Sequence, residues 1–149
     1  MLDPWYITGF CDGEAAFTYS RAGGTFALYF AIKQRQDNRQ LLEEIWEYFN
    51  YVGNIYQHKE SLPAKDSSVS QPAAYYRVTR IHELKRIVEH FDKYPLQSKK
   101  KQEVYKIWRE MVMYKLENYC NIEYDTLRVL AERLSISNLQ SRAFKIDTR

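Results

Sequence analysis

Two carboxylates, Asp12 and Glu14, close a stretch whose pattern predicts a helix over residues 4–13. Negative charge is disfavoured there, because the C-terminal end of a helix carries the negative pole of its dipole and unpaired carbonyl oxygens. Gly9 and Gly13 lie four residues apart on one helix face, which costs up to about 1 kcal/mol each relative to alanine but lets another backbone approach closely. A carboxylate beside free carbonyl oxygens offers the hard oxygen ligands that suit Mg²⁺. The alternative interpretation is that Asp-Gly only ends the helix and that Glu14 is solvated.

A run of three lysines at positions 99–101 opens a later predicted helix. Cations are disfavoured at a helix N-terminus, where the dipole is positive. A neighbouring phosphate would relieve this repulsion. The alternative is a solvated run of surface lysines.

The elements that must position these residues follow from hydrophobic periodicity. In the segment 25–35 the apolar residues Phe26, Leu28, Phe30 and Ile32 alternate with others, as in a strand with one buried face and one free face. The patterns predict strands at 15–21, 25–35, 53–60 and 74–80, and helices at 37–50, 82–91, 99–119 and 123–134, with a last short helix near 137–143. This order, αββαββα followed by further helices, predicts an α+β fold. The chain, 1–149, is expected to form a single domain, with a core over 1–120 and a C-terminal helical extension over 121–149.

Composition excludes several classes of protein. The chain has 149 residues, a net charge of +3 and 45% hydrophobic residues, which fits one folded domain and not a disordered segment. Cys11 and Cys120 give no disulfide framework, and three scattered histidines do not form the dense cluster of a zinc site. No apolar run approaches the ~18 residues of a membrane span, so no membrane association is expected.

Charge is segregated along the chain. Residues 16–36 contain basic side chains and no acidic ones, whereas the predicted helix at 37–50 has four acidic side chains and one arginine, a net charge of −3. A basic free sheet face would suit phosphate contacts. An ordinary solvated sheet face is the alternative.

The segment ITGFCDGEA at residues 7–15 resembles the signature of the LAGLIDADG homing endonucleases. The resemblance continues through Ala16-Phe17, FAIKQ at 30–34 and YPLQSKK at 94–100, and so covers roughly residues 5–110. The chain departs from the family pattern at Thr8, where alanine is usual, at Cys11, and at Glu14, where many members have aspartate. Only one signature occurs, and the single-motif members of the family are homodimers of about this size.

The resemblance implies roles for the residues around this signature. Two motif helices would pack along a two-fold axis through Ile7, Gly9, Phe10 and Gly13. Glu14 and the Gly13 carbonyl would hold Mg²⁺ at the scissile phosphates, while Asp12 would support structure. Gln34 would position water, with Asn38 or Arg39 nearby, unless it is only a strand-end amide bonded to the backbone. Lys100, or its neighbour Lys99, would lie near the scissile phosphate.

The resemblance also implies a saddle-shaped antiparallel sheet whose free face contacts double-stranded DNA in the major groove. The DNA-binding residues expected from strand alternation are Thr18, Ser20, Thr25, Tyr29, Lys33, Tyr56, His58, Tyr75, Arg77 and Thr79. Arg77 has the geometry to bind guanine with two hydrogen bonds. From strand length, the site would span roughly 15–22 bp.

The function expected from the sequence is metal-dependent, site-specific cleavage of double-stranded DNA. One alternative is a nucleic-acid-binding module that does not cleave, either an intron RNA splicing factor or a DNA-binding regulator. Another is an interaction protein whose glycine-lined helix only dimerises. Members of the family are often encoded in organellar introns, so an organellar location is expected, mitochondrial rather than chloroplast, with no targeting segment.

Overall fold

The computed structural model describes residues 2–22, 25–58 and 72–137. Its elements, in chain order, are α1 (Pro4–Glu14), β1 (Ala15–Ala22), β2 (Thr25–Arg35), the 3₁₀ turn η1 (Gln36–Asn38), α2 (Arg39–Tyr48), β3 (Asn54–His58), β4 (Ala73–Val78), α3 (Ile81–Lys93), α4 (Lys99–Glu117) and α5 (Tyr124–Ser137). The expected α+β order is confirmed. The predicted helix at 37–50 is shorter, because its first turn is 3₁₀, and the helix expected near 137–143 falls almost entirely outside the described residues.

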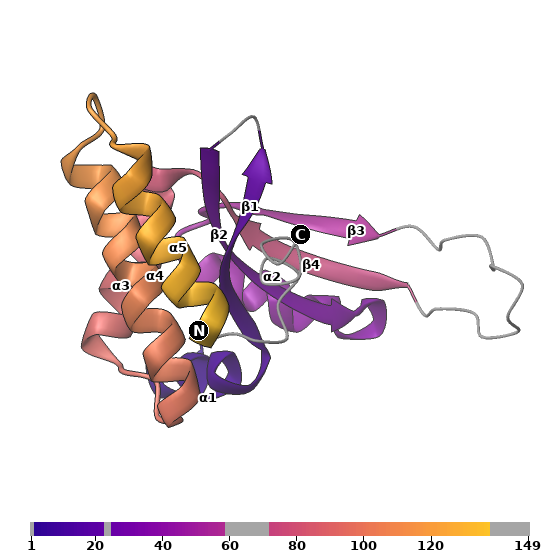
Figure 1. Cartoon of the computed structure of the whole chain (residues 1–149). Coiled ribbons are helices and arrows are strands. Elements are labelled where there is room, and N and C mark those ends of the chain that lie inside the picture. The colour runs from indigo at the N-terminus through magenta and orange to yellow at the C-terminus, as the bar shows by residue number, and fades with distance from the viewer. Residues whose placement is uncertain (1, 23–24, 59–71, 138–149) are drawn as a thin grey trace, which may run out of the picture.

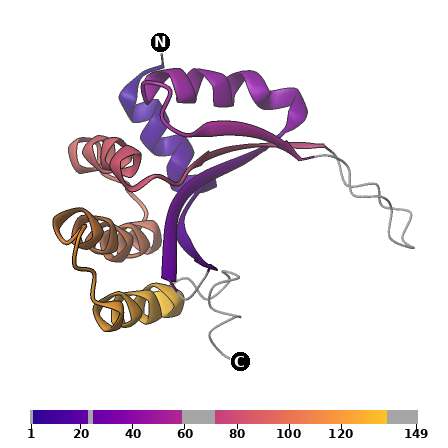
Figure 2. The ribbon, with the colours of Figure 1, turned by 90° about the horizontal axis from the view of Figure 1, so that it is seen from above.

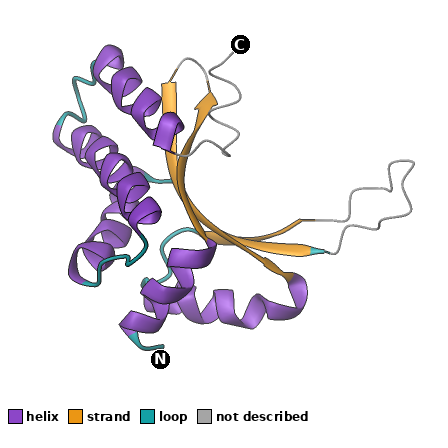
Figure 3. Cartoon of the chain, turned by 60° about the horizontal axis from the view of Figure 1, so that its bottom comes forward, coloured by secondary structure: helices purple, strands orange, loops and turns teal. Residues whose placement is uncertain are grey.

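The four strands form one antiparallel sheet in the order β1-β2-β4-β3. Figures 2 and 3 show that the sheet is strongly curved and that the five helices of the described residues all cover its convex side. The concave side is left uncovered by these helices, as expected for a saddle. Because side chains alternate across a strand, this arrangement separates a core face from an open face.

The core lies between the convex face of the sheet and the helices. On β2 the alternating residues Phe26, Leu28, Phe30 and Ile32 are each 2% exposed or less. Phe17 of β1 packs edge-on against the rings of Phe91 and Trp108, and the Trp108 indole N–H donates to the Thr18 carbonyl at 3.0 Å. The C-terminal helix α5 joins the same core through Leu127, Ala131 and Leu134. Among the described residues, no helix is long and apolar enough to cross a membrane.

His90 of α3 is buried, with 2% of its surface exposed, in the part of the core beneath α1. Its Nε2 lies 3.0 Å from Thr8 Oγ1, and its Nδ1 lies 2.9 Å from the Tyr48 hydroxyl. Burial, and secondarily the nearby Arg86 guanidinium, lower the pKa of His90 from its ordinary 6.5 to about 4. The ring is therefore neutral at physiological pH.

This burial predicts a pH dependence of stability. Between pH 6.5 and about 4 the unfolded chain binds a proton at His90 that the folded chain does not, so stability falls as the pH is lowered through that window, by about 3 kcal/mol in all. The effect is measured by urea unfolding of the wild type and of His90→Gln across this pH range. The carboxylates titrate in both proteins, so the difference between the two isolates the contribution of His90. Over this range we expect the free energy of unfolding to fall by about 3 kcal/mol less in His90→Gln than in the wild type. An equal slope in the two proteins would contradict the assignment, and His82→Gln, on an exposed histidine of the same helix, is the control.

Candidate active site and nucleic-acid interface

Glu14 is the last residue of α1, and its side chain is exposed where the helix passes into β1. The Gln34 amide nitrogen, at the far end of β2, donates to Glu14 Oε2 at 3.4 Å and to the Lys33 carbonyl at 2.9 Å. Asn38 Nδ2 in turn donates to Gln34 Oε1 at 2.9 Å. The structure thus brings Glu14 and Gln34 together, and Gln34 makes a backbone bond as well.

Asp12 has a different environment. Its carboxylate accepts hydrogen bonds from the backbone N–H groups of Gln97 and Ser98, at 3.3 and 3.0 Å, and from the Ser98 hydroxyl at 2.9 Å. These groups precede and cap α4, whose N-terminal dipole favours an anion. The unfavourable position of Asp12 at the end of one helix is therefore offset by the start of another, and its oxygens are occupied in fastening α1 to α4.

The lysine run places one side chain against the motif helix and leaves another open. Lys101 Nζ donates to the Ala15 carbonyl at 2.6 Å, and burial lowers the pKa of Lys101 from its ordinary value. Lys100 is exposed. Both side chains line a cavity of about 380 Å³, together with Asp12, Gly13 and Ala16. Lys99 does not line this cavity.

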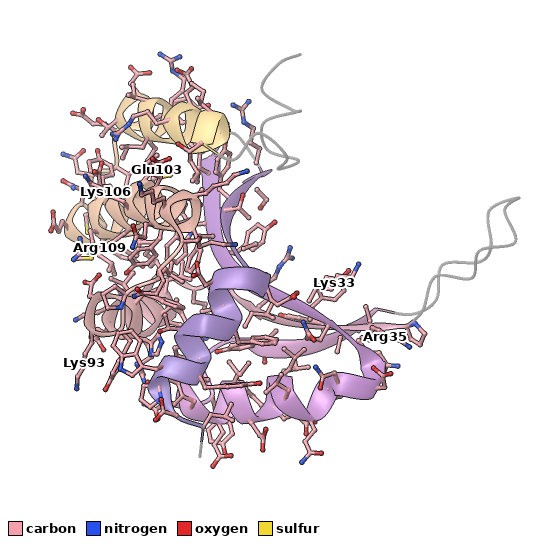
Figure 4. The ribbon with its side chains drawn as sticks, turned by 90° about the horizontal axis from the view of Figure 1, so that it is seen from below. Lys33, Arg35, Lys93, Glu103, Lys106 and Arg109 are labelled. Atoms are coloured by element: carbon pink, nitrogen blue, oxygen red, sulfur yellow. The ribbon has the colours of Figure 1, made fainter. Side chains whose placement is uncertain are left out.

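The concave face is organised in rows that run across the strands. Cross-strand pairing aligns Ala16, Ala31, Arg77 and Asn54 in one row, and Lys33, Tyr75 and Tyr56 in the next. The Arg77 guanidinium stacks over the Tyr29 ring at 4.2 Å, and Lys33 Nζ lies 5.6 Å from the Tyr75 ring centre. Figure 4 shows Lys33 extending into the open concave side, whereas Lys93, Lys106 and Arg109 extend from the outer side of the helices.

The pairing places nearly all the predicted DNA-binding residues on this concave face. They are Thr18, Ser20, Thr25, Tyr29, Lys33, Tyr56, Tyr75 and Arg77. His58 ends β3 in register with Ala73, and its side chain lies outside the described part of the structure. Thr79 is exposed but lies just beyond β4, so it is not in a cross-strand row. Thr18 is on the face yet only 8% exposed, which leaves it little surface for a ligand. Asn54 is exposed on the same face, in register with Arg77, but is not among the predicted DNA-binding residues. Strand alternation could have found it, because it lies two residues before Tyr56.

The exposed side of α1 carries two glycines and two aromatic rings. A Cβ added to Gly9 or Gly13 would have no neighbouring atom within 4 Å. The stacked rings of Tyr6 and Phe10, 6.3 Å apart, lie on the same side, and Tyr6 is 48% exposed. Ile7, which the sequence suggested for a dimer contact, is fully buried in the core of this chain, so it adds nothing to this face.

Residues 7–112 match a family model described as LAGLIDADG endonuclease. The chain belongs to the LAGLIDADG endonuclease family. Among curated proteins, an uncharacterised 50.9 kDa protein in ND4 intron 1 of Podospora anserina is 32% identical over 76% of this chain and 25% of its own length. A probable intron-encoded endonuclease 2 of Neurospora crassa is 29% identical over 97% of this chain and 31% of its own length. The chain therefore spans about a quarter to a third of these relatives.

Solved structures of LAGLIDADG endonucleases share the fold. The homing endonuclease I-GzeII in complex with its DNA target is 25% identical, with a TM-score of 0.74 over 99% of this chain and 49% of that one. The meganuclease I-AabMI bound to uncleaved DNA is 27% identical, with a TM-score of 0.75 over 98% of this chain and 48% of that one. The homing endonuclease I-TnaI is 23% identical, with a TM-score of 0.75 over 97% of this chain and 95% of its own.

The donor set at the LAGLIDADG helix can be compared with what Mg²⁺ requires. Across residues 2–22, 25–58 and 72–137, no group of three or more His, Cys, Asp or Glu side chains could hold a metal ion by itself. At the C-terminal end of α1, with Asp12 occupied, one exposed carboxylate remains, that of Glu14, beside the Gly13 carbonyl. Mg²⁺ is commonly held by one or two carboxylates, with waters and substrate phosphates completing its shell. These residues fit such an ion and do not fit a metal enclosed by protein ligands alone.

The two cavity lysines of this LAGLIDADG chain should differ in what they stabilise. Lys101→Met leaves the Ala15 carbonyl without its charged donor, and we expect it to lower the free energy of unfolding by about 1–3 kcal/mol. Lys100→Met removes an exposed charge and should change it by less than about 0.5 kcal/mol. Urea unfolding measures both. Equal destabilisation by the two variants would show that the contact between Lys101 and Ala15 contributes nothing.

Proposed function

We propose that the chain is one half of a site-specific endonuclease that hydrolyses both strands of double-stranded DNA at a long pseudo-palindromic site, with Mg²⁺. The observation that carries this proposal is the position of Glu14. Its exposed carboxylate lies where the open glycine face of α1 meets the basic concave sheet, within hydrogen-bonding reach of Gln34. A carboxylate so placed lies beside both a surface for a second protein half and a surface for DNA.

The second half would be another copy of the chain. Two α1 helices crossing at Gly9 and Gly13 would approach closely and bring two Glu14 side chains together. The match to I-TnaI over 95% of its length supports this, since a chain of this size with one such fold exists. I-GzeII and I-AabMI are matched over about half their lengths, 49% and 48%, so each has room for two such units in one chain.

In the proposed reaction each side chain has a separate task. Glu14 and the Gly13 carbonyl would hold the ion, which when bound would polarise the phosphate, orient water and stabilise the leaving oxygen. The Gln34 amide, fixed by Asn38, hydrogen-bonds the attacking water. Lys100, open to the cavity beside Gly13, contacts the scissile phosphate. Asp12 and Lys101 keep α1, β1 and α4 in place through the contacts described above.

DNA would lie in the concave face of the sheet. I-GzeII in complex with its DNA target and I-AabMI bound to uncleaved DNA share this fold, which supports DNA as the ligand. On this face Arg77 stacks on the Tyr29 ring and Lys33 lies beside the Tyr75 ring. These cation–π contacts restrict the conformations of the two long side chains. Arg77 held in this way is prepared to bind a guanine edge in the major groove.

If Arg77 contacts a base, Arg77→Ala should cost about 1–3 kcal/mol in binding and relax the preference at one position of each half-site. If Lys33 contacts only phosphate, Lys33→Ala should weaken binding to all sequences about equally. Profiling both variants on a randomised half-site library measures this. Equal weakening of all sequences by Arg77→Ala would make it a phosphate contact instead.

The experiment that tests the proposed function starts by selecting duplexes from a randomised library with the purified protein in Ca²⁺, and then adds Mg²⁺. We expect one family of sequences to be retained and then cut. Retention without cutting would favour the alternative of a binding module, and a parallel selection with RNA tests the splicing interpretation. Failure to retain either nucleic acid would leave an interaction protein.

For location, we propose that the protein acts in an organelle, the mitochondrion rather than the chloroplast. The relatives whose names place them in introns of Podospora anserina and Neurospora crassa support an intron origin. Expression with an organelle marker in the source organism tests it, and nuclear accumulation would contradict it.

A further inference from the structure

The core side of α1 carries a polar residue at its centre. Of the eleven residues of the helix only Ile7, Thr8 and Cys11 are buried, and Thr8 is 1% exposed. Its hydroxyl donates to the Tyr94 carbonyl at 2.8 Å, in the connection between α3 and α4, and lies 3.0 Å from His90 Nε2. A buried hydroxyl with two partners of fixed direction defines both the rotation and the height of the helix that carries it.

These contacts also fix the protonation pattern of His90. The Thr8 hydroxyl has one hydrogen, which it gives to the Tyr94 carbonyl, so toward His90 it accepts and Nε2 must carry the proton. Nδ1 is then the acceptor for the Tyr48 hydroxyl, 2.9 Å away on α2. The imidazole ring of α3 therefore donates to Thr8 of α1 and accepts from Tyr48 of α2, and so links the three helices.

The ring has little freedom to turn. It packs at nearly right angles against Tyr48, Phe49 and Phe91, with ring centres 5.2, 5.4 and 4.7 Å away. Because cores are densely packed, a flip of the ring would need all three neighbours to move. His90 thus presents its Nε2 proton to α1 from one fixed position.

Glu14 lies six residues beyond Thr8, about 9 Å along the helix axis. Between these two residues, Asp12 attaches the helix to the start of α4 through the Ser98 backbone N–H. The direction of α1, and with it the place of the carboxylate and of the glycine face, depends on these two attachments together with the packing of Ile7 and Cys11 in the core. A shift of about 1 Å in a reacting group can cost on the order of 100-fold in rate.

We propose that His90 is a positioning residue for Glu14, acting through Thr8. It rests on the proposed function, since Glu14 is taken to act at the scissile phosphate. His90 does not touch DNA or metal: it is buried beneath α1, and its hydrogen-bond partners are Thr8 and Tyr48. Its effect is on the precision with which α1 is held, and so on rate more than on affinity.

The test compares Thr8→Val, which keeps the shape and removes the hydroxyl, with Thr8→Ser, which keeps the hydroxyl. On the selected duplex with Mg²⁺ under single-turnover conditions, Thr8→Val should cut about 10–100-fold more slowly, while the Kd for DNA in Ca²⁺ stays within about threefold. Thr8→Ser should restore the rate to within about threefold of wild type. Tyr48→Phe, which removes the donor to Nδ1, should slow cleavage in the same direction, and His82→Gln on the same helix should not. Cleavage by Thr8→Val at the wild-type rate, or failure of Thr8→Ser to restore it, would overturn the proposal.

Two readouts keep this test separate from the proposed function. Nitrogen-15 NMR of the histidines should show His90 protonated at Nε2 only in the wild type, and hydrogen exchange at amides 10–14 should be at least tenfold faster in Thr8→Val. A wild type that does not cleave would contradict the proposed function but leave these measurements decisive for His90. Unchanged exchange, or an Nδ1-protonated ring in the wild type, would overturn the positioning role even if the wild type cleaves.

Discussion

Glu14→Gln is expected to reduce Mg²⁺-dependent cleavage by at least 100-fold while leaving DNA affinity in Ca²⁺ within about threefold of wild type. The amide keeps the size of the side chain and can still contact Gln34, but it loses the charge that holds a hard cation. One charge per subunit is small beside the many phosphate contacts of a long duplex. The measurement is single-turnover cleavage of the selected site together with filter binding.

Asp12→Asn is the matched control, because it removes a carboxylate two residues away on the same helix. It removes the negative charge and one of the two acceptor oxygens that bind Gln97 and Ser98 at the start of α4, so we expect it to lower the free energy of unfolding by about 0.5–2 kcal/mol. Glu14→Gln, whose side chain is exposed, should leave stability almost unchanged. If Glu14→Gln cleaved efficiently and with the same dependence on Mg²⁺ concentration as the wild type, the Glu14 carboxylate would not be the metal ligand.

Gly13→Leu is expected to abolish cleavage by preventing two α1 helices from meeting. In the single chain a side chain at this position points into open space, so the fold should tolerate it and the melting temperature should fall by no more than a few degrees. In a close helix pair the same side chain would hold the backbones apart. Light scattering, with and without the duplex, and cleavage of the selected site measure the two effects together.

Gly53→Ala is the contrasting glycine variant. Gly53 has φ of +73°, and an added Cβ would collide with the Arg77 carbonyl oxygen, so we expect loss of stability there. A Gly13→Leu protein that remains dimeric and active, or a wild type that cuts DNA as a monomer, would remove the basis for the proposed assembly. A melting temperature lowered as much by Gly13→Leu as by Gly53→Ala would show that Gly13 serves the fold instead.

Local rules were enough to find the motif helix and the open sheet face. Asp3 caps α1 and Pro4 follows it, and the alternation along β2 separates the buried from the open residues as expected. The sequence could not show that Asp12 lies against the start of α4, because that contact joins residues 86 positions apart. Local rules alone therefore suggest a ligand at Asp12, whereas the family resemblance assigns it a supporting role, and the structure places its carboxylate on the start of α4.

The lysines show a related limit. Positions 100 and 101 both fall within one helical turn of the buried residue Val104, so spacing along α4 could not decide which side chain turns inward. The structure places the Lys101 amine on the Ala15 carbonyl and leaves Lys100 open to the cavity. Burial of Ile7 was missed for a similar reason, since the motif helix has both a core side and an exposed side of mixed composition.

Mapping the cut ends on both strands of the selected duplex at single-nucleotide resolution tests the central claim most directly. Two copies of the chain, each presenting one Glu14, should produce one cut per strand at positions related by the pseudo-two-fold centre of the site. Both cuts should require Mg²⁺ and both should disappear in Glu14→Gln. Intact strands in Mg²⁺, cuts scattered along the duplex, or symmetric cuts that persist in Glu14→Gln would contradict the account.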